Sequence, residues 1–269
     1  MEAATVREPS MRAPGFAVVA RQELRDLWLG GRGVALLLAF SVLISVITYL
    51  SATNQSVNFL EQHEAVNLTL QVGVAVGGLL ALLIGADAIS GERERGTLES
   101  LLLTPVPRAQ LIAGKLVAAL SVWFAAMIVT VPYVWFLGRD VGAVGDAIGS
   151  GFGVGTLIAL GLAGFGLVVS TLARSNRLSL SVTLLVLLGL FAPTQLPTGA
   201  QQGWAGDLLL RVNPVSAGLH YIGKVVVNQH DWGQDVSWLV SPIAASVVFG
   251  VLALALAPRL LTLQGGGAR

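Results

Sequence analysis

Cysteine is absent from the 269-residue sequence, so neither disulfides nor thiolate metal sites are available. Histidine is almost as scarce, and the three present are His63, His220 and His230. They follow no fixed spacing such as H-x-x-x-H, in which two imidazoles share one helix face and can hold a zinc ion. We therefore interpret the histidines as surface residues and expect no metal site.

Lysine is scarce as well, with only Lys115 and Lys224. A phosphate-binding loop of the form G-x-x-x-x-G-K-[ST] needs Ser or Thr after its lysine, but Leu116 and Val225 follow here. The chain therefore cannot itself be a P-loop ATPase. We expect no nucleotide or other cofactor to be bound by this chain.

Charged residues make up only 12% of the sequence, hydrophobic residues make up 54%, and the mean hydropathy is +0.76. These values exclude an ordinary soluble domain and indicate a polytopic membrane protein. A hydrocarbon core about 30 Å thick needs roughly 20 apolar residues per helix. We predict an all-α fold in one transmembrane domain, residues 1–269. Its six expected spans lie near 33–52, 66–89, 111–137, 148–172, 178–196 and 237–257.

Lys and Arg divide unequally between the two sides that these spans define. With the N-terminus inside, 13 of the 16 fall on the cytoplasmic side, and the exceptions are Arg139, Arg211 and Lys224. By the positive-inside tendency, both termini are expected to be cytoplasmic and segment 197–236 external. Residues 1–32 are polar and resemble no signal peptide, so the first span is expected to stay in the protein. Segment 197–236 carries enough apolar surface to lie on the outer leaflet.

A helix lying in the headgroup plane is expected over residues 13–32. Its apolar side would be formed by Phe16, Ala20, Leu24, Leu27 and Trp28. Arg21 and Arg25 fall on the other side, whereas Glu23 interrupts the apolar stripe. Such a helix is either an elbow that transmits motion from a cytoplasmic partner to the first span or an interfacial anchor, and the sequence leaves both open.

Few ionisable residues lie within the spans, which argues against a proton- or ion-coupled carrier. Asp87 is the one acidic residue there, near the cytoplasmic end of its span, where it would pair with Arg93 or Arg95 or reach water; we favour water. An intramembrane serine protease is equally poorly supported. Ser150 lies between two glycines, but no predicted span contains a histidine to act as its base.

The densest charge cluster, Glu92 to Glu99, lies between the second and third spans. Leu98, Leu101 and Leu102 give it one apolar side, which predicts a short amphipathic helix at the membrane face. Ser90 is expected to cap this helix, Arg95 and Glu99 to pair, and Thr104-Pro105 to end it. Gly96 predicts a bend or a close backbone approach. The simplest interpretation is a solvated connector.

The stretch ERERGTLESLLLTPVPRAQLIAGKLVAA, Glu92 to Ala119, nevertheless resembles the first cytoplasmic loop and following helix of ABC-2-type transporter permeases. The recurrent pattern there is E-x-x-x-G-T-x-E-x-L-L-x-x-P-x-x-R-x-x-x-x-x-G-K. Asn213-Pro214 is similar to a motif before the last span of that family. The resemblance implies that the short helix is a coupling helix, which docks into a cleft of the ATP-binding subunit. The implied interface residues are Glu92, Arg93, Glu94, Arg95, Gly96, Thr97, Leu98, Glu99, Leu102, Pro105 and Arg108.

The same resemblance implies a permease subunit of an exporter driven by ATP and magnesium in a separate ATP-binding cassette subunit. Two permeases, identical or related, would form a dimer in a bacterial cytoplasmic membrane, in contact with lipids and with no nucleic acid. Because the spans hold no charge cluster, an amphiphilic or hydrophobic substrate is expected, such as a drug-like molecule, a lipid or a glycan carrier. The alternative function is a membrane scaffold or assembly protein that transports nothing.

Overall fold

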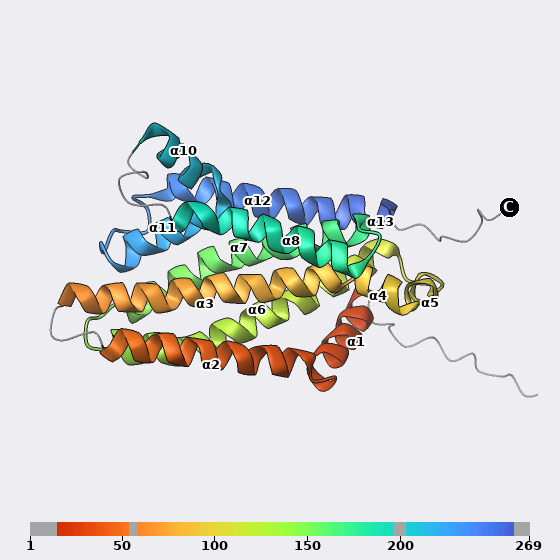
Figure 1. Ribbon diagram of the computed structural model, residues 1–269, viewed down its shortest axis with the longest axis horizontal. Helices are drawn as coiled ribbons and strands as arrows, with labels where there is room; N and C mark the ends of the chain where they lie inside the picture. The colour runs from red at the N-terminus through yellow and green to blue at the C-terminus, as the bar shows by residue number, and fades with distance from the viewer. Residues whose placement is uncertain (1–14, 54–58, 196–202, 261–269) are drawn as a thin grey trace, which may run out of the picture.

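The computed structural model describes residues 15–53, 59–195 and 203–260, and the part of the chain that it describes contains helices and no strands. Figure 1 shows long helices running side by side along one axis. Helices α1, α4 and α5 lie at one end of this bundle, and α10 and α11 lie at the other. The all-α prediction is confirmed.

In the described residues, six helical segments are long and apolar enough to cross a membrane, as the sequence predicts. Four of them are single helices: α2 (Arg32–Thr53), α3 (Phe59–Asp87), α6 (Arg108–Gly138) and α7 (Val144–Leu172). The fifth consists of α8 (Asn176–Phe191) and a 3-10 turn, Ala192–Gln195. The sixth runs from a 3-10 turn (Val236–Leu239) through α12 (Val240–Val251) and a π-helical turn (Leu252–Leu256) into α13 (Ala257–Leu260). Helix α3 begins earlier than its expected span at 66. Its first turns are polar and precede the apolar run from which the span was predicted.

Helices α3, α6 and α7 form the centre of the bundle. In their most apolar windows 56% of the residues are buried, against 17–22% in α2, in the α8 span and in the α12 span. Two glycines allow α3 and α7 to touch along their backbones. A Cβ atom on Gly166 would lie 2.6 Å from the carbonyl oxygen of Leu82, and one on Gly85 would lie 2.6 Å from that of Ala163. Such small-residue contacts take the place of the hydrophobic effect in holding helices together in lipid.

Helix α1 (Gly15–Leu29) packs directly on α6. Val19, Ala20 and Leu27 are buried, while Phe16 of the predicted apolar side is exposed. A Cβ atom on Gly114 of α6 would lie 2.6 Å from the Val19 Cγ1 atom, so only glycine leaves room for this contact. The observed helix therefore lies against the protein through much of the side that was expected to face lipid.

The predicted external segment 197–236 contains two helices, α10 (Trp204–Val212) and α11 (Pro214–Val226), while residues 196–202 lie outside the described part. Asn213 caps α11, because its Oδ1 atom accepts hydrogen bonds from the backbone N–H groups of Val215 and Ser216. Pro214 occupies the first helical position, where no N–H is needed. Most of α11 is buried against α7 and α3, so this helix is part of the bundle.

Candidate partner-binding site at the charged end of the bundle

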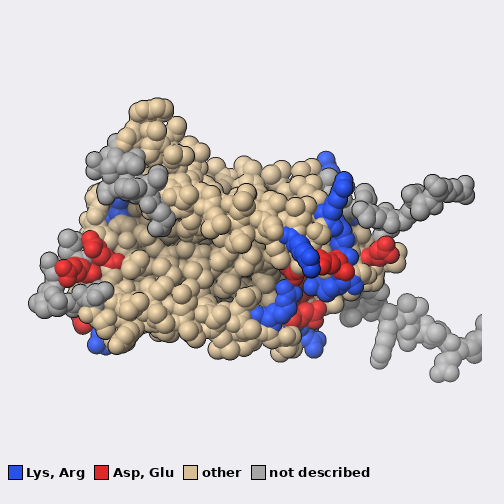
Figure 2. Space-filling model, viewed as in Figure 1, with Lys and Arg blue, Asp and Glu red and all other residues tan. Residues whose placement is uncertain are grey.

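Charged residues gather at the two ends of the molecule, and the broad band between them shows none on the face in Figure 2. Lys and Arg concentrate at the end that carries α1, α4 and α5. The band without charge has the properties required of a surface that faces hydrocarbon. We call the end that carries α1, α4 and α5 the charged end of the bundle.

The loop between α3 and α6 contains two short helices, α4 (Ser90–Arg95) and α5 (Leu98–Leu102). Gly96 separates them with φ +72°, a left-handed conformation that suits glycine, so the predicted bend is confirmed. The predicted Ser90 cap is wrong. Ser90 is buried where α3 leads into α4, and its hydroxyl lies within hydrogen-bond distance of two acceptors, the Ala86 carbonyl at 2.8 Å and Asn176 Oδ1 at 3.0 Å.

Asp87 lies at the end of α3 and is only 9% exposed, so the expectation that it reaches water is wrong. Its carboxylate accepts a hydrogen bond from Arg32 at 2.7 Å and another from Asn176 Nδ2 at 2.8 Å. Arg95 Nη1 lies 3.8 Å away. The alternative pairing with Arg95 is therefore present. The expected Arg95–Glu99 pair is not formed within the described residues, because the bend at Gly96 turns the two side chains apart.

Arg93 points into the protein. Its guanidinium donates to the backbone carbonyls of Thr171, in the last turn of α7, and of Ala173, in the turn that joins α7 to α8. Glu94 holds the same turn, because its Oε2 atom accepts from the backbone N–H of Asn176 at 3.1 Å. One side of α4 is thus fixed to the α7–α8 turn.

Glu92, the first residue of the family-like pattern, forms an ion pair with Lys115, the last residue of that pattern. The Lys115 Nζ atom lies 2.5 Å from Glu92 Oε1 and 2.7 Å from Glu23 Oε1 on α1. This contact explains why Glu23 interrupts the apolar stripe of α1. Burial raises the pKa of the Glu92 carboxyl, and the Lys115 ammonium opposes that shift.

The residues predicted to meet a partner therefore divide into two groups. Glu92 and Arg93 make internal contacts, Leu98 is buried and Leu102 packs against the core. The exposed members are Glu94, Arg95, Gly96, Thr97, Glu99, Pro105 and Arg108. Among these, Glu94 and Arg95 also contact Asn176 and Asp87. Leu103, which the sequence prediction missed, is 75% exposed. It lies outside the Leu98–Leu101–Leu102 stripe, and that offset is the signal that could have identified it.

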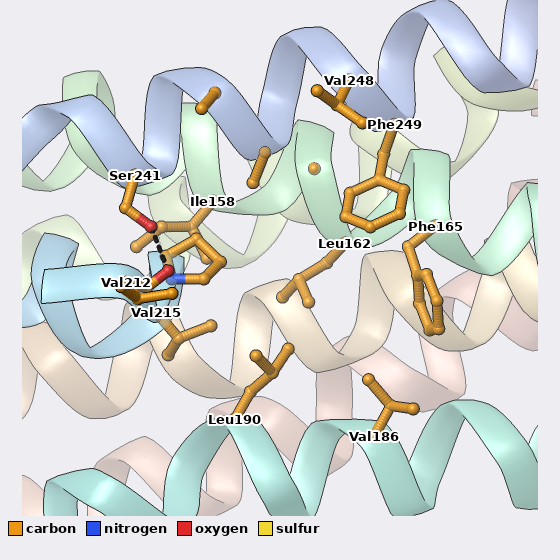
Figure 3. A pocket seen from close by; sticks show the side chains of 14 residues that line it. Ile158, Leu162, Phe165, Val186, Leu190, Val212, Val215, Ser241, Val248 and Phe249 are labelled. Carbon is orange, nitrogen blue, oxygen red and sulfur yellow. Dashed lines mark hydrogen bonds between the residues drawn. The ribbon is translucent and has the colours of Figure 1, made fainter. Parts of the chain in front are cut away.

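A second feature is an apolar cavity of about 330 Å³ between α7, α8, α11 and α12. Figure 3 shows Phe165 and Phe249 at one end of it, with ring centroids 5.2 Å apart. At the other end the Ser241 hydroxyl donates to the carbonyl of Val212, so its hydrogen-bonding capacity is used within the protein. The remaining lining is apolar, which suits a hydrophobic molecule better than a polar one.

The histidines lie at the end opposite to α4. His63 is buried and contacts Gln229 through its Nε2 atom at 3.0 Å, so its interpretation as a surface residue is wrong. The longer α3 places this residue inside a span helix, contrary to the sequence prediction that spans lack histidine.

Hydrogen bonds from Lys224 and His230 hold the pKa of Asp235 below its usual range. No group of three possible metal ligands occurs in the described residues.

The six long apolar helices and the charge-free band define a multi-pass helical membrane protein. The sequence profile of ABC-2 family transporter proteins matches residues 17–261, and the chain therefore belongs to this family. Family membership supports a role as an ABC transporter permease subunit and implies an ATP-binding cassette partner.

Two curated relatives match a shorter part of the chain. A probable ABC transporter permease protein NosY of Stutzerimonas stutzeri is 36% identical over 104 residues, which cover 37% of this chain and 36% of the relative. The protein of the same name in Pseudomonas aeruginosa is 35% identical over 107 residues, with 38% of each chain covered. These matches span little more than a third of the length of either relative.

Proposed function

We propose that this chain is the permease subunit of an ATP-driven exporter and that the exposed side of α4 and α5 binds the ATP-binding cassette subunit. The observation that carries the proposal is the two-sided character of this loop. Its inner side is fixed to α3, α6 and the α7–α8 turn, while its outer side presents Glu99, Leu103 and Arg108 to the surroundings. A connector that merely spans two helices needs no such anchoring.

Leu103 is the expected apolar anchor of this interface. Protein interfaces draw most of their binding free energy from a few large side chains that fill pockets, with charged residues at the rim. Glu99 and Arg108 would form the rim here. The apolar stripe of α5 cannot supply the anchor, because Leu98 is already buried in the protein.

The charged end is proposed to lie in the cytoplasm of a bacterial cell, within the inner membrane. The excess of Lys and Arg at this end supports the orientation by the positive-inside tendency. The six spans place α1 and α13 at the same end, so both termini would be cytoplasmic. ATP and magnesium would bind to the partner subunit, which would supply the energy for transport. This chain has no phosphate-binding loop with which to hydrolyse ATP itself.

A hydrophobic or amphiphilic substrate is proposed for the exporter. The apolar cavity between α8 and α12 and the charge-free band support this class over an ionic substrate. Large apolar side chains on the outer faces of α2, α8 and α12 are exposed, as expected if lipids and a second permease, identical or related, cover them. The alternative, a scaffold that transports nothing, would have no requirement for an ATPase.

The test is affinity purification of the tagged chain from its native membrane, followed by identification of bound subunits and an ATPase assay in lipid nanodiscs. Leu103→Asp places a charge at the position where an apolar side chain is expected to be buried in the partner subunit. We expect it to lower recovery of the ATP-binding subunit by about tenfold or more, as for a binding hot spot. Leu29→Asp is the matched control, because Leu29 is equally exposed at the charged end but belongs to α1.

Full recovery of an ATP-binding subunit with Leu103→Asp would contradict the proposed interface. A wild-type chain that retains no nucleotide-binding subunit would favour the scaffold.

A further inference from the structure

Lys115 is the most deeply buried charged side chain of the described residues at the charged end, with 2% of it exposed. Its ammonium belongs to α6, and its two carboxylate partners belong to α1 and α4. A buried charge is tolerated only when its partners satisfy it closely. The cluster of Glu23, Lys115 and Glu92 therefore holds three separate helices in one geometry.

Close packing of α1 on α6 adds to the ion pairs of Lys115 in positioning α1. Gly114, the neighbour of Lys115, allows α1 to approach α6 so closely that a Cβ atom there would lie 3.0 Å from the backbone nitrogen of Ala20. Helix α1 is therefore positioned on α6 by packing and tied to α4 through Lys115. Helix α2 begins at Arg32, shortly after α1 ends at Leu29, so a displacement of α1 would reach the first span directly.

The neighbouring Asp87 cluster has a different character. Its arginine partners, Arg32 and Arg95, are each more than half exposed, so water weakens these contacts. The Lys115 ammonium is more closely shielded, because only 2% of this side chain is exposed, while its partners Glu23 and Glu92 are 25% and 16% exposed. When α4 is displaced, the contacts at Asp87 can exchange with water, whereas those at Lys115 cannot be replaced without a large cost.

Space for such a displacement exists between α1 and the α4–α5 loop. A cavity of about 660 Å³ lies there, with Glu23 and Asp26 of α1 on one wall and Thr97 and Ser100 of the loop on another. Lys115 also lines this cavity. The loop can therefore move toward α1 while its contact with Lys115 stays in place.

We infer that the Glu23–Lys115–Glu92 cluster is a pivot, with Lys115 as its positioning residue, through which displacement of α4 by the ATP-binding partner is passed to α1 and the first span. This inference rests on the proposed function. It assigns Glu92 and Lys115 of the family-like pattern to transmission within the chain, and it leaves partner binding to Glu99, Leu103 and Arg108. It also decides between elbow and anchor for α1, in favour of the elbow.

The test compares three forms of the complex with its ATP-binding partner in nanodiscs. The neutral variant Glu23→Gln/Lys115→Met/Glu92→Gln removes all three charges together, so no unpaired charge is left buried. Lys115→Arg is the conservative variant. Each form carries Arg25→Cys on the exposed side of α1 as a reporter, and the chain has no other cysteine. The rate of maleimide labelling is measured without nucleotide and with ATP and vanadate.

We expect the wild-type and Lys115→Arg complexes to show a labelling rate that changes with nucleotide. The neutral variant should retain its partner but lose this change, and its ATPase rate should fall by about tenfold, a typical coupling effect. Should the neutral variant fail to fold, Glu92→Gln alone, which preserves the Glu23–Lys115 pair, is expected to lose the same response.

An unchanged labelling response in the neutral variant, or in Glu92→Gln, would overturn the pivot while leaving the proposed partner intact. Failure of the wild-type chain to retain an ATP-binding subunit would overturn the proposed function and the pivot with it. Recovery of the partner is therefore scored separately from the response of α1.

Discussion

Lys115 and Asp87 are two ion-pair centres in one region, and their surroundings give them different energetic weights. Removal of one partner from a buried pair leaves an uncompensated charge and costs about 3–5 kcal/mol. Pairs that remain in contact with water contribute about 0–1 kcal/mol. Lys115 belongs to the first kind and Asp87, whose arginine partners are exposed, is closer to the second.

Lys115→Met is therefore expected to lower the free energy of unfolding by about 3–5 kcal/mol, because Glu23 and Glu92 are left without their ammonium. Asp87→Asn should cost about 1 kcal/mol, since Arg32 can turn to water. Thermal unfolding in detergent measures both. Equal losses for the two substitutions would show that the Lys115 cluster is as well hydrated as the Asp87 cluster. Addition of Glu23→Gln and Glu92→Gln to Lys115→Met should recover most of the lost stability.

At the scale of elements, the bend at Gly96 determines which side chains of the loop face outward. A residue with a Cβ atom costs about 1–2 kcal/mol in this left-handed conformation. Gly96→Ala should therefore destabilise the bend and reduce recovery of the ATP-binding subunit. Gly142 has a similar φ of +74° in the turn between α6 and α7, at the other end of the molecule.

Gly142→Ala is thus the matched control, with the same backbone cost and no expected effect on the partner. Co-purification and thermal unfolding of both variants separate stability from binding. Equal loss of partner in the two variants would assign the effect to general destabilisation and contradict a specific role for the bend.

The helices also show which structural features could be predicted from the sequence and which could not. Long apolar runs predict the six spans because the hydrocarbon core requires about 20 apolar residues of every spanning helix. The bend at Gly96 was predictable because glycine has a local conformational preference. The direction of Glu92 and Arg93 was not predictable, because their partners Lys115 and Ala173 lie far away in the chain. The burial of His63 was missed for a related reason, since it depends on contact with Gln229.

On the scale of the whole molecule, a glycine-packed centre of α3, α6 and α7 is surrounded by helices that expose apolar side chains. The centre is closely packed, and under the proposed function the exposed apolar side chains of the outer helices would face lipid and a second permease. The charged end is anchored on its inner side and exposed on its outer side. Force is therefore expected to enter the molecule at α4 and α5 and to reach the spans through α1 and α2.

The most direct measurement is photocrosslinking in native membranes from a benzophenone amino acid in place of Leu103, with a second form carrying it in place of the buried Leu98. The account predicts that the probe at position 103 captures a P-loop ATP-binding subunit and that the probe at position 98 reacts within the chain. Capture of that subunit from position 98 but not from position 103 would contradict the proposed interface. Capture of no nucleotide-binding protein from either position would contradict the central claim that this chain works with an external ATPase.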